Sequence, residues 1–456
     1  MIQSASKIIP IESLHNIEEN LILVKLRIVF YGSLLKILFD LSYVWALQVK
    51  WSSLFLVDAN LPSILLSGIS IVILLLALPV QKDTANYFLS ILLFAVIIPM
   101  STIFAFQSRS CQYFLFVCIS FLFVEIVLGK FGVLSYNYNK NIGCLTRYAF
   151  YIIVLATVIW LFIELGMPTL TALDWTSVYI LRSSYDISSH LSRLSRITAM
   201  TIIPILFADS LLARKYWVSA IFCVAQLLIY LWLGHKIYLF MFAVVVFSAK
   251  IANMKNKQHV IILTLKALLA VIMLLTVSEI VGNEYSSKIA GAASSGYSYV
   301  ARRGLFVPAQ LRFDYYDFFV TAKKPTVGFL GTVISPLLTR LGVSDPYASS
   351  SYSQAVSTWL GFESNANTGI FGGEMAHFGV WGIPVAAICL LILLLCVRIG
   401  NRRNGYIFTM SSSLFPFLYL MNGEVTEIFG FTSLGMLIVA LLLYQPMSER
   451  VKSTCN

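Results

Sequence analysis

The sequence predicts an all-α, polytopic integral membrane protein with about twelve transmembrane helices and one large extracytoplasmic loop at residues 283–373. Of its 456 residues, 59% are hydrophobic and 12% are charged, whereas soluble domains average about 25% charged residues. Apolar runs long enough to cross a bilayer recur along the chain. Basic residues gather in the short connections on one side of these runs. We therefore expect residues 1–456 to form a single polytopic membrane domain.

The apolar runs locate the expected spans. A helix satisfies its own backbone polar groups, as hydrocarbon requires, and about 20 residues cross the bilayer. The candidate spans are residues 28–48, 60–80, 86–107, 111–129, 148–166, 197–213, 216–233, 235–250, 260–281, 376–398, 406–422 and 427–445. The connections at 107–111 and 233–236 are too short for ordinary loops, so ten or eleven spans is the alternative count.

The charges indicate the orientation. With the N-terminus inside, the short cytoplasmic connections hold most of the basic residues, as the positive-inside rule requires, and both termini are cytoplasmic. The first 25 residues lack the pattern of a cleaved signal peptide, so the first span is expected to act as the signal. The net charge of +11 is spread over these connections. It therefore reflects topology and does not indicate a nucleic-acid partner.

Cysteine and acidic patterns predict no metal and no disulfide in the large loop. None of the seven cysteines falls within residues 283–373, and no Cys spacing typical of zinc sites occurs. The chain also lacks the paired aspartates that hold a divalent cation in nucleotide-sugar enzymes. We therefore expect chemistry without a metal or another cofactor.

A smaller outer segment, residues 167–196, contains an amphipathic pattern. A continuous helix over 176–196 would place Arg182, Arg193 and Arg196 near one face. One interpretation is an interfacial helix whose arginines meet lipid headgroups. The other is a pyrophosphate clamp, because guanidinium groups bind phosphate oxygens bidentately and keep their charge. Arg182 is the leading candidate for such a clamp.

The large loop contains an arginine-rich and aromatic run, RRGLFVPAQLRFDYYDFF, at residues 302–319. Aromatic faces suit the apolar CH patches of sugar rings, and arginines suit phosphates. The run could equally be an aromatic belt at the membrane surface. As substrate-binding candidates it supplies Arg302, Arg303, Arg312, Tyr315 and Tyr316.

A glycine-rich run, FESNANTGIFGGEMAHFGVWG at residues 362–382, precedes a late span. Its glycines allow either close approach to a ligand or tight helix packing. Asn365 and Asn367 are candidate substrate contacts. Its titratable groups, Glu363, Glu374 and His377, are the candidates for a catalytic base, although a lone histidine here could simply be a structural hydrogen-bonding group.

Charges inside predicted spans have two interpretations. Lys36 and Asp40 are four residues apart and are expected to neutralise each other on one helix face. His235 and Lys236 follow Gly234 at a predicted outer helix break. Lys236 could face an anionic substrate, or the segment could be a polar turn between two spans.

Three segments in this order carry a resemblance to a known family. They are GHKIYLF at 234–240, the run at 302–319, and NANTGIFGGEMAHFG at 365–379. With the two outer loops and about a dozen spans, the chain resembles the O-antigen polymerases, or oligosaccharide repeat unit polymerases. That family often shows an arginine followed eleven positions later by glycine. Here the eleventh residue after Arg182 is Arg193, and the eleventh after Arg303 is Asp314.

The resemblance implies a membrane glycosyltransferase with a GT-C-like architecture in the bacterial inner membrane. Such an enzyme transfers a growing glycan from undecaprenyl pyrophosphate to a hydroxyl of a new lipid-linked repeat unit, on the periplasmic face. Its partners would be the two undecaprenyl-pyrophosphate-linked oligosaccharides, membrane lipids, a chain-length regulator and a flippase. It implies that Arg182, Arg302 and Arg303 contact pyrophosphate and that Glu363, Glu374 or His377 assists the attacking hydroxyl.

Two alternatives remain open at this stage. An O-antigen ligase would share the topology and the pyrophosphate chemistry but would use lipid A core as acceptor. A flippase or other transporter for lipid-linked oligosaccharides would be expected to carry more charges inside the membrane and no loop of about 90 residues. The absence of an internal repeat favours an enzyme over a carrier.

Overall fold

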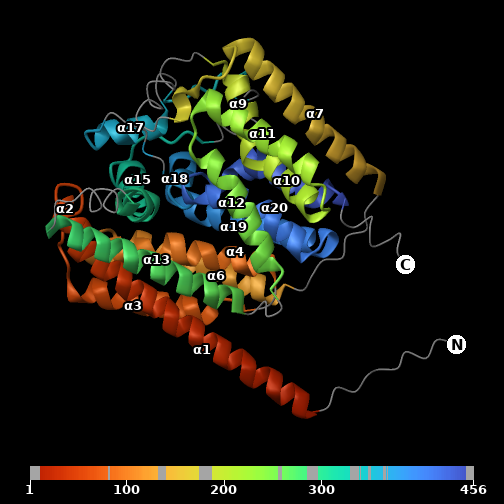
Figure 1. Ribbon diagram of the computed structural model, residues 1–456. Helices are drawn as coiled ribbons and strands as arrows, with labels where there is room; N and C mark the ends of the chain where they lie inside the picture. The colour runs from red at the N-terminus through yellow and green to blue at the C-terminus, as the bar shows by residue number, and fades with distance from the viewer. Residues whose placement is uncertain are drawn as a thin grey trace. The chain divides into compact units, whose positions relative to one another are not determined.

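The computed structural model describes residues 11–80, 83–131, 140–173, 187–254, 259–284, 296–328, 338, 340–347, 351–362, 366 and 368–447. The regular structure of these residues is helical, and no β-strand occurs among them (Figure 1). The all-α prediction is confirmed. Arg182, Glu363, Asn365 and Asn367 lie outside the described residues.

The helices follow the predicted spans closely. In chain order they are α1 (Ile11–Ser42), α2 (Gln48–Lys50), α3 (Leu61–Ala77), α4 (Thr84–Leu92), α5 (Ile98–Phe106), α6 (Cys111–Lys130), α7 (Lys140–Leu165), α9 (Ser189–Ile197), α10 (Ile203–Leu212), α11 (Tyr216–Leu233), α12 (Ile237–Ala252), α13 (His259–Glu284), α15 (Val307–Tyr316), α17 (Tyr352–Trp359), α18 (Gly373–Phe378), α19 (Gly382–Asn404), α20 (Tyr406–Leu418) and α21 (Ser433–Leu443). Short π-helical segments join several of them: η1 (Tyr43–Leu47), η2 (Leu93–Ile97), η4 (Thr198–Ile202), η5 (Ser298–Phe306) and η6 (Asp317–Thr321).

Seven helical segments of the described chain are long and apolar enough to cross a membrane: Thr84–Phe106, Cys111–Lys130, Ile142–Leu165, Ser189–Leu212, Tyr216–Leu233, His259–Val281 and Gly373–Asn404. Four shorter apolar helices are Leu61–Ala77, Ile237–Ala252, Tyr406–Met421 and Ser433–Leu443. The protein is therefore a polytopic membrane protein by length and composition, and the count of twelve spans stays a prediction.

Local sequence signals explain several helix ends. Asn60 caps α3, because its side chain accepts a hydrogen bond from the Ser63 N–H at 2.8 Å. Thr432 caps α21 in the same way through the Gly435 N–H. Gly234 ends α11 with φ +65°, a left-handed conformation that glycine adopts without strain. The predicted break between the spans on either side of residues 233–236 is thus confirmed.

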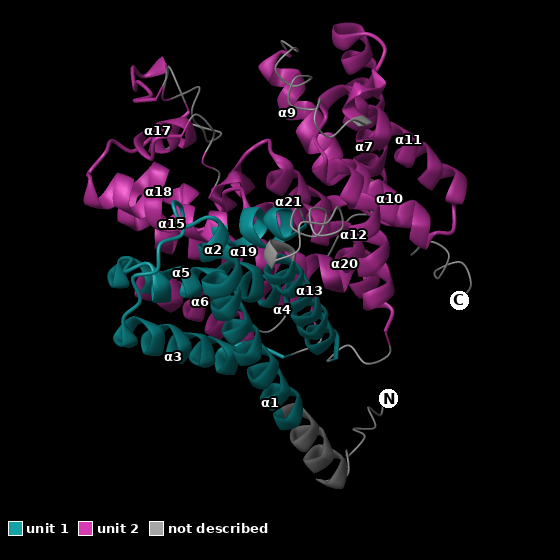
Figure 2. Ribbon diagram, turned by 60° about the vertical axis from the view of Figure 1, so that its left-hand side comes forward, with its two compact units in different colours: residues 1–82, 90–114, 256–306 teal, residues 83–89, 115–255, 307–456 magenta. Residues whose placement is uncertain are grey.

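The chain divides into two compact units (Figure 2). Unit 1 comprises residues 1–82, 90–114 and 256–306, and in it α1 packs against α3 and α13. Lys36 on α1 is almost fully buried, and its Nζ lies 2.5 Å from the Asp40 carboxylate. The Thr102 hydroxyl donates to the same carboxylate at 2.7 Å. The predicted neutralisation of Lys36 by Asp40 is confirmed.

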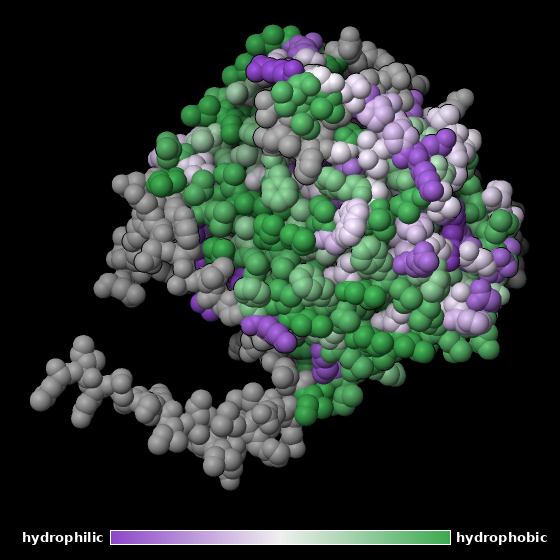
Figure 3. Space-filling model, turned by 180° about the vertical axis from the view of Figure 1, so that it is seen from behind, coloured by the Kyte–Doolittle hydropathy of each residue, from purple (hydrophilic) through white to green (hydrophobic). Residues whose placement is uncertain are grey.

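Unit 2 comprises residues 83–89, 115–255 and 307–456. In it α20 packs against α10 and α12, and α19 packs against α21. Its core is apolar and includes Ile203, Leu206, Ile229 and Met241. Large apolar side chains also remain exposed, for example Ile163 and Trp217, and Figure 3 shows mostly hydrophobic residues over one face of the molecule. Such exposure is expected where lipid is the solvent.

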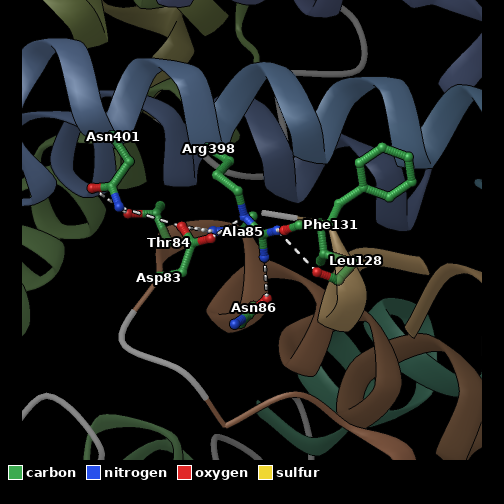
Figure 4. Close-up of polar contacts among 8 residues, drawn as sticks. All are labelled: Asp83, Thr84, Ala85, Asn86, Leu128, Phe131, Arg398 and Asn401. Carbon is green, nitrogen blue, oxygen red and sulfur yellow. Dashed lines mark hydrogen bonds and ion pairs between the residues drawn. The ribbon is translucent and has the colours of Figure 1, made fainter. Parts of the chain in front are cut away.

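One buried arginine joins three helical segments of unit 2 (Figure 4). Arg398 on α19 is 3% exposed and pairs with the Asp83 carboxylate. It also donates to the Asn86 side chain at 3.1 Å and to the carbonyls of Leu128 and Phe131 at 2.9 and 2.7 Å. Those carbonyls lie at the C-terminal end of α6, where a cation is favoured. Arg398 therefore fixes the ends of α4 and α6 against α19.

Candidate functional site

The short helix α18 places two of the predicted catalytic residues inside unit 2. Glu374 and His377 both lie on α18 and are buried. The helix α18 packs against α15, which belongs to the predicted large loop. Two candidate bases from the glycine-rich run thus face the interior of the unit.

His377 is held at both ring nitrogens. Its Nδ1 lies 2.8 Å from the Gly328 carbonyl oxygen, and its Nε2 lies 2.8 Å from the Glu424 Oε2. Because a carbonyl oxygen can only accept, Nδ1 carries a hydrogen. The short contact at Nε2 then requires a proton between the imidazole and the Glu424 carboxyl. His377 and Glu424 therefore form a proton-sharing pair.

Glu424 is the acidic member of this pair. It was not among the site residues predicted from the sequence. Its Oε1 accepts a hydrogen bond from the Tyr352 hydroxyl, and the Thr426 hydroxyl approaches its Oε2 at 3.5 Å. Burial by itself would raise the pKa of Glu424, but the charge of His377 and the hydrogen bonds from His377, Tyr352 and Thr426 outweigh it and lower the pKa. Glu424 is therefore an ionised carboxylate. An acidic residue between the last two apolar runs was the available signal.

Glu374 provides a second carboxyl group beside the pair. It is fully buried, and its Oε1 accepts the Val425 N–H at 2.6 Å. Its Oε2 is buried without a hydrogen-bond partner among the described residues. A buried carboxyl oxygen without a partner is costly, so such groups commonly serve a function. Glu374 is thus positioned by one oxygen, while the other remains available as a proton acceptor or donor.

The glycines of the 362–382 run bring the backbone close to this site. A Cβ on Gly373 would lie 2.3 Å from the Glu424 Cγ, and one on Gly369 would lie 2.3 Å from the Met421 carbonyl oxygen. Gly369 also has φ +80°. These glycines therefore permit tight packing of the run against residues 421–424, which is the packing alternative raised by the sequence.

Replacing Gly373 with alanine is expected to destabilise the protein by about 1–3 kcal/mol, because the added methyl overlaps Glu424 and forces the backbone to shift. Replacing Gly68 in α3 is the matched control, since no atom lies within 4 Å of its added Cβ and alanine favours the helix. Thermal unfolding in detergent measures both. Equal melting temperatures of the two variants would contradict the packing role of Gly373.

Arg312, a predicted substrate-binding candidate, is buried among main-chain carbonyls. It is 1% exposed, and it donates from Nε to the Ile370 carbonyl at 2.8 Å and from Nη2 to the Met421 carbonyl at 3.1 Å. The guanidinium therefore joins α15 to the glycine-rich run and to the segment before Glu424. In this arrangement Arg312 positions the site.

The two predicted tyrosines lie on the same helix as Arg312. The Tyr315 hydroxyl donates to the Ala366 carbonyl at 2.7 Å, and its ring lies 6.5 Å from the ring of Tyr352. Burial, together with the Glu424 charge, raises the pKa of Tyr315 well above its usual value. Tyr316 is also buried. The structure thus brings Tyr315, Arg312, Glu374 and His377 together around Glu424.

A third carboxyl group, Glu427, lies near the arginines of α9. The Tyr419 hydroxyl donates to its Oε1 at 2.8 Å. Burial raises the pKa of Glu427 to about 7, whereas the Tyr419 hydrogen bond and the charges of Arg196 and Arg193 act in the opposite direction. Both arginines are exposed, and α9 continues through η4 into α10. The helical residues at the end of the predicted amphipathic segment, residues 189–196, thus form the N-terminal end of a helix that is long enough to cross a membrane.

Glu427 predicts a pH dependence of stability. A folded-state pKa of about 7 against an ordinary 4.5 means that the folded protein keeps this proton longer than the unfolded chain. Its contribution to stability therefore falls as pH rises from about 4.5 to 7 and is constant above. Replacing Glu427 with glutamine is expected to remove that fall. Melting temperatures of both proteins across pH 4–8 test this, and a constant difference between them would contradict it.

The remaining predicted residues are not part of this cluster or lie outside the described chain. Lys236 precedes α12 in unit 2 and is partly exposed. Arg302 and Arg303 belong to unit 1. Arg182, Glu363, Asn365 and Asn367 lie outside the described residues, so their roles stay predictions.

The described residues contain no group of three or more His, Cys, Asp or Glu side chains that could hold a metal ion. The site is instead a set of proton-exchanging groups, which can accept or donate a proton and stabilise charge. No protein-family model, curated protein or solved structure matches this chain. Its function must therefore be argued from the site and from the membrane fold.

Proposed function

We propose that this protein is a metal-independent membrane glycosyltransferase that polymerises undecaprenyl-pyrophosphate-linked oligosaccharide repeat units. The product would be O-antigen or a related surface polysaccharide, made by en bloc transfer on the periplasmic face of the bacterial inner membrane. The observation that carries the proposal is the buried cluster of Glu374, His377 and Glu424. Two residues of the predicted large loop contact this cluster, Gly328 through His377 and Tyr352 through Glu424.

The cluster supplies the proton chemistry that glycosyl transfer needs. The acceptor hydroxyl must lose a proton as its oxygen attacks the anomeric carbon, while the bond from that carbon to the pyrophosphate oxygen breaks. Glu374 and Glu424 are the candidate acceptors of this proton. His377 is anchored at both nitrogens, so it acts best as the charged partner that orients Glu424.

Tyr352 controls access to this carboxylate. Its hydroxyl donates to the Glu424 Oε1, and α17 carries it from the large loop. The Trp359 ring at the other end of α17 packs at 5.5 Å against Phe318. An acceptor hydroxyl would take the place of the Tyr352 hydroxyl at Glu424.

Arginines would stabilise the leaving pyrophosphate. Two charge-assisted hydrogen bonds to its oxygens offset the charge that develops as the glycosidic bond breaks. Arg193 and Arg196 of α9 are exposed and close enough to Glu427 to affect its pKa. Arg182, which lies outside the described residues, is the third candidate for this clamp.

A proton-coupled transporter of lipid-linked oligosaccharides is the second candidate. The observation that favours it is the same cluster, because buried carboxylates and histidines within membrane helices commonly form proton pathways. Lys36 and Asp40 in unit 1 add a partly buried ion pair. A transporter would move the lipid without forming a glycosidic bond.

Reconstitution separates the candidates. The full chain is placed in liposomes with one defined undecaprenyl-pyrophosphate-linked repeat unit, and products are separated by size. A ladder of repeat units is expected from a polymerase. Movement of the lipid between leaflets without a ladder would identify a transporter, and transfer only to added lipid A core would identify a ligase.

A further inference from the structure

Unit 1 contains a cluster of cations and aromatic rings. We call Lys50, Trp51, Tyr297, Arg302 and Arg303 the Trp51 cluster. The Tyr297 ring stacks on Trp51 with a centroid distance of 6.2 Å and an interplanar angle of 8°. The Arg302 Cζ lies 4.8 Å and the Lys50 Nζ 5.2 Å from the centroid of the same Trp51 ring. Both cations are within the range of a cation–π interaction.

The core of unit 1 holds this cluster rigidly. Tyr297 is fully buried, and its hydroxyl lies 2.8 Å from the Ser42 hydroxyl, which also accepts a hydrogen bond from Thr276 at 3.0 Å. Arg302 donates from Nε and Nη2 to the Ser298 hydroxyl at 3.1 and 2.9 Å. Trp51 and Arg302 are therefore positioned before any ligand arrives.

The cluster has an excess of positive charge. Lys50 pairs with Glu279 at 2.6 Å. Arg302 and Arg303 are adjacent, and neither forms an ion pair with a described residue. Burial and the neighbouring Arg303 lower the pKa of Arg302, which means that its charge lacks compensation. A bound anion would supply that compensation.

The surroundings of the cluster are apolar and exposed. Tyr299 and Val300, within η5, are 49% and 46% exposed, and the Arg303 Cζ lies 5.5 Å from the Tyr299 ring. Leu56 and Val57, which follow Trp51 in the chain, are 66% and 43% exposed. Arginine and tryptophan beside exposed apolar side chains are typical of the membrane–water interface. The anion expected here is therefore attached to a lipid.

We propose that the Trp51 cluster binds the phosphate group of an anionic membrane lipid, with Arg302 and Arg303 donating to its oxygens and Trp51 holding Arg302 in place. Lys50 adds a further positive charge beside the same ring. The lipid is either a polyprenyl pyrophosphate or an anionic phospholipid. The first source rests on the proposed function, whereas the site itself does not depend on it.

Binding to the purified, delipidated full chain tests the proposal. The probes are undecaprenyl pyrophosphate, phosphatidylglycerol and zwitterionic phosphatidylcholine, measured by native mass spectrometry. We expect at least one anionic lipid to bind at least tenfold more tightly than phosphatidylcholine. Arg302→Gln, Arg303→Gln and Trp51→Leu should each weaken that binding at least fivefold. Arg402→Gln is the matched control, because Arg402 is exposed and lies in α19 of unit 2.

The outcomes separate the source of the phosphate and the two proposals. Selective binding of undecaprenyl pyrophosphate supports the site with a polyprenyl ligand, and equal binding of phosphatidylglycerol supports it with a phospholipid. Because Arg303 is exposed, Arg303→Gln should fold normally. Its melting temperature is compared with that of the wild type to check this. If the three variants bound each lipid as tightly as the wild type does, the proposal would be overturned. Wild-type protein that binds an anionic lipid through the cluster but forms no polymer ladder would reject the proposed reaction alone.

Discussion

Replacing Glu424 with glutamine is expected to lower polymer formation at least 100-fold while the protein stays folded. Glutamine preserves the size of the side chain and can still accept the Tyr352 hydroxyl hydrogen bond. It removes the negative charge that faces the His377 Nε2, and with it the shared proton. General acid–base groups contribute about 10²- to 10⁴-fold to rates. The readout is the length and yield of the polymer ladder in liposomes.

Two variants make this result specific. Glu427→Gln removes a neighbouring carboxyl group without touching His377 and is expected to retain most of the activity. Tyr352→Phe removes only the hydroxyl that covers Glu424 and is expected to change the concentration of acceptor needed more than the maximal rate. A polymer ladder of wild-type yield from Glu424→Gln, at equal protein level, would eliminate Glu424 as a catalytic residue.

Replacing Arg398 with methionine is expected to destabilise the protein by about 3–5 kcal/mol, the range for breaking a buried ion pair by removing one partner. The variant leaves the Asp83 carboxylate without its buried cation and the carbonyls of Leu128 and Phe131 without a donor (Figure 4). Methionine is unbranched and packs adaptably, so little strain is added. Unfolding in increasing denaturing detergent measures the loss.

The exposed neighbour Arg402 provides the control, since Arg402→Met removes the same charge from the same helix and should change stability by less than about 1 kcal/mol. The double variant Asp83→Asn with Arg398→Met should recover part of the loss, because no unpaired charge remains buried. If Arg398→Met and Arg402→Met unfolded at the same detergent concentration, the network of Figure 4 would have no role in stability.

Local patterns in the sequence predicted the helices and one ion pair correctly. Apolar run length is a property of consecutive residues, so α6 and α11 begin and end close to the predicted bounds. Lys36 and Asp40 are four residues apart on one helix, and this spacing alone brings their side chains together. Similarly, Gly234 at a predicted break adopts the left-handed conformation that ends α11.

Residues far apart in sequence could not be paired in advance. Glu374 and His377 were candidates from their own segment, but nothing local in the sequence paired them with Glu424, which contacts His377 and lies 47 residues further on. Arg312 illustrates the opposite case. Its aromatic and basic neighbours made it a candidate for substrate binding, and only the tertiary structure shows its guanidinium donating to the carbonyls of Ile370 and Met421.

The sequence by itself determined that this is a helical membrane protein, because hydrocarbon requires long apolar segments whose backbone hydrogen bonds are internal. It also singled out Glu374 and His377, which the structure buries together on α18. Only the tertiary structure decided which polar groups meet: Glu424 with His377, Arg398 with Asp83, and Trp51 with Arg302. The physical reason is that a buried charge is stable only beside a partner, and helix packing brings that partner from a distant part of the chain. The residues next to the charge in the sequence do not show which partner it will be.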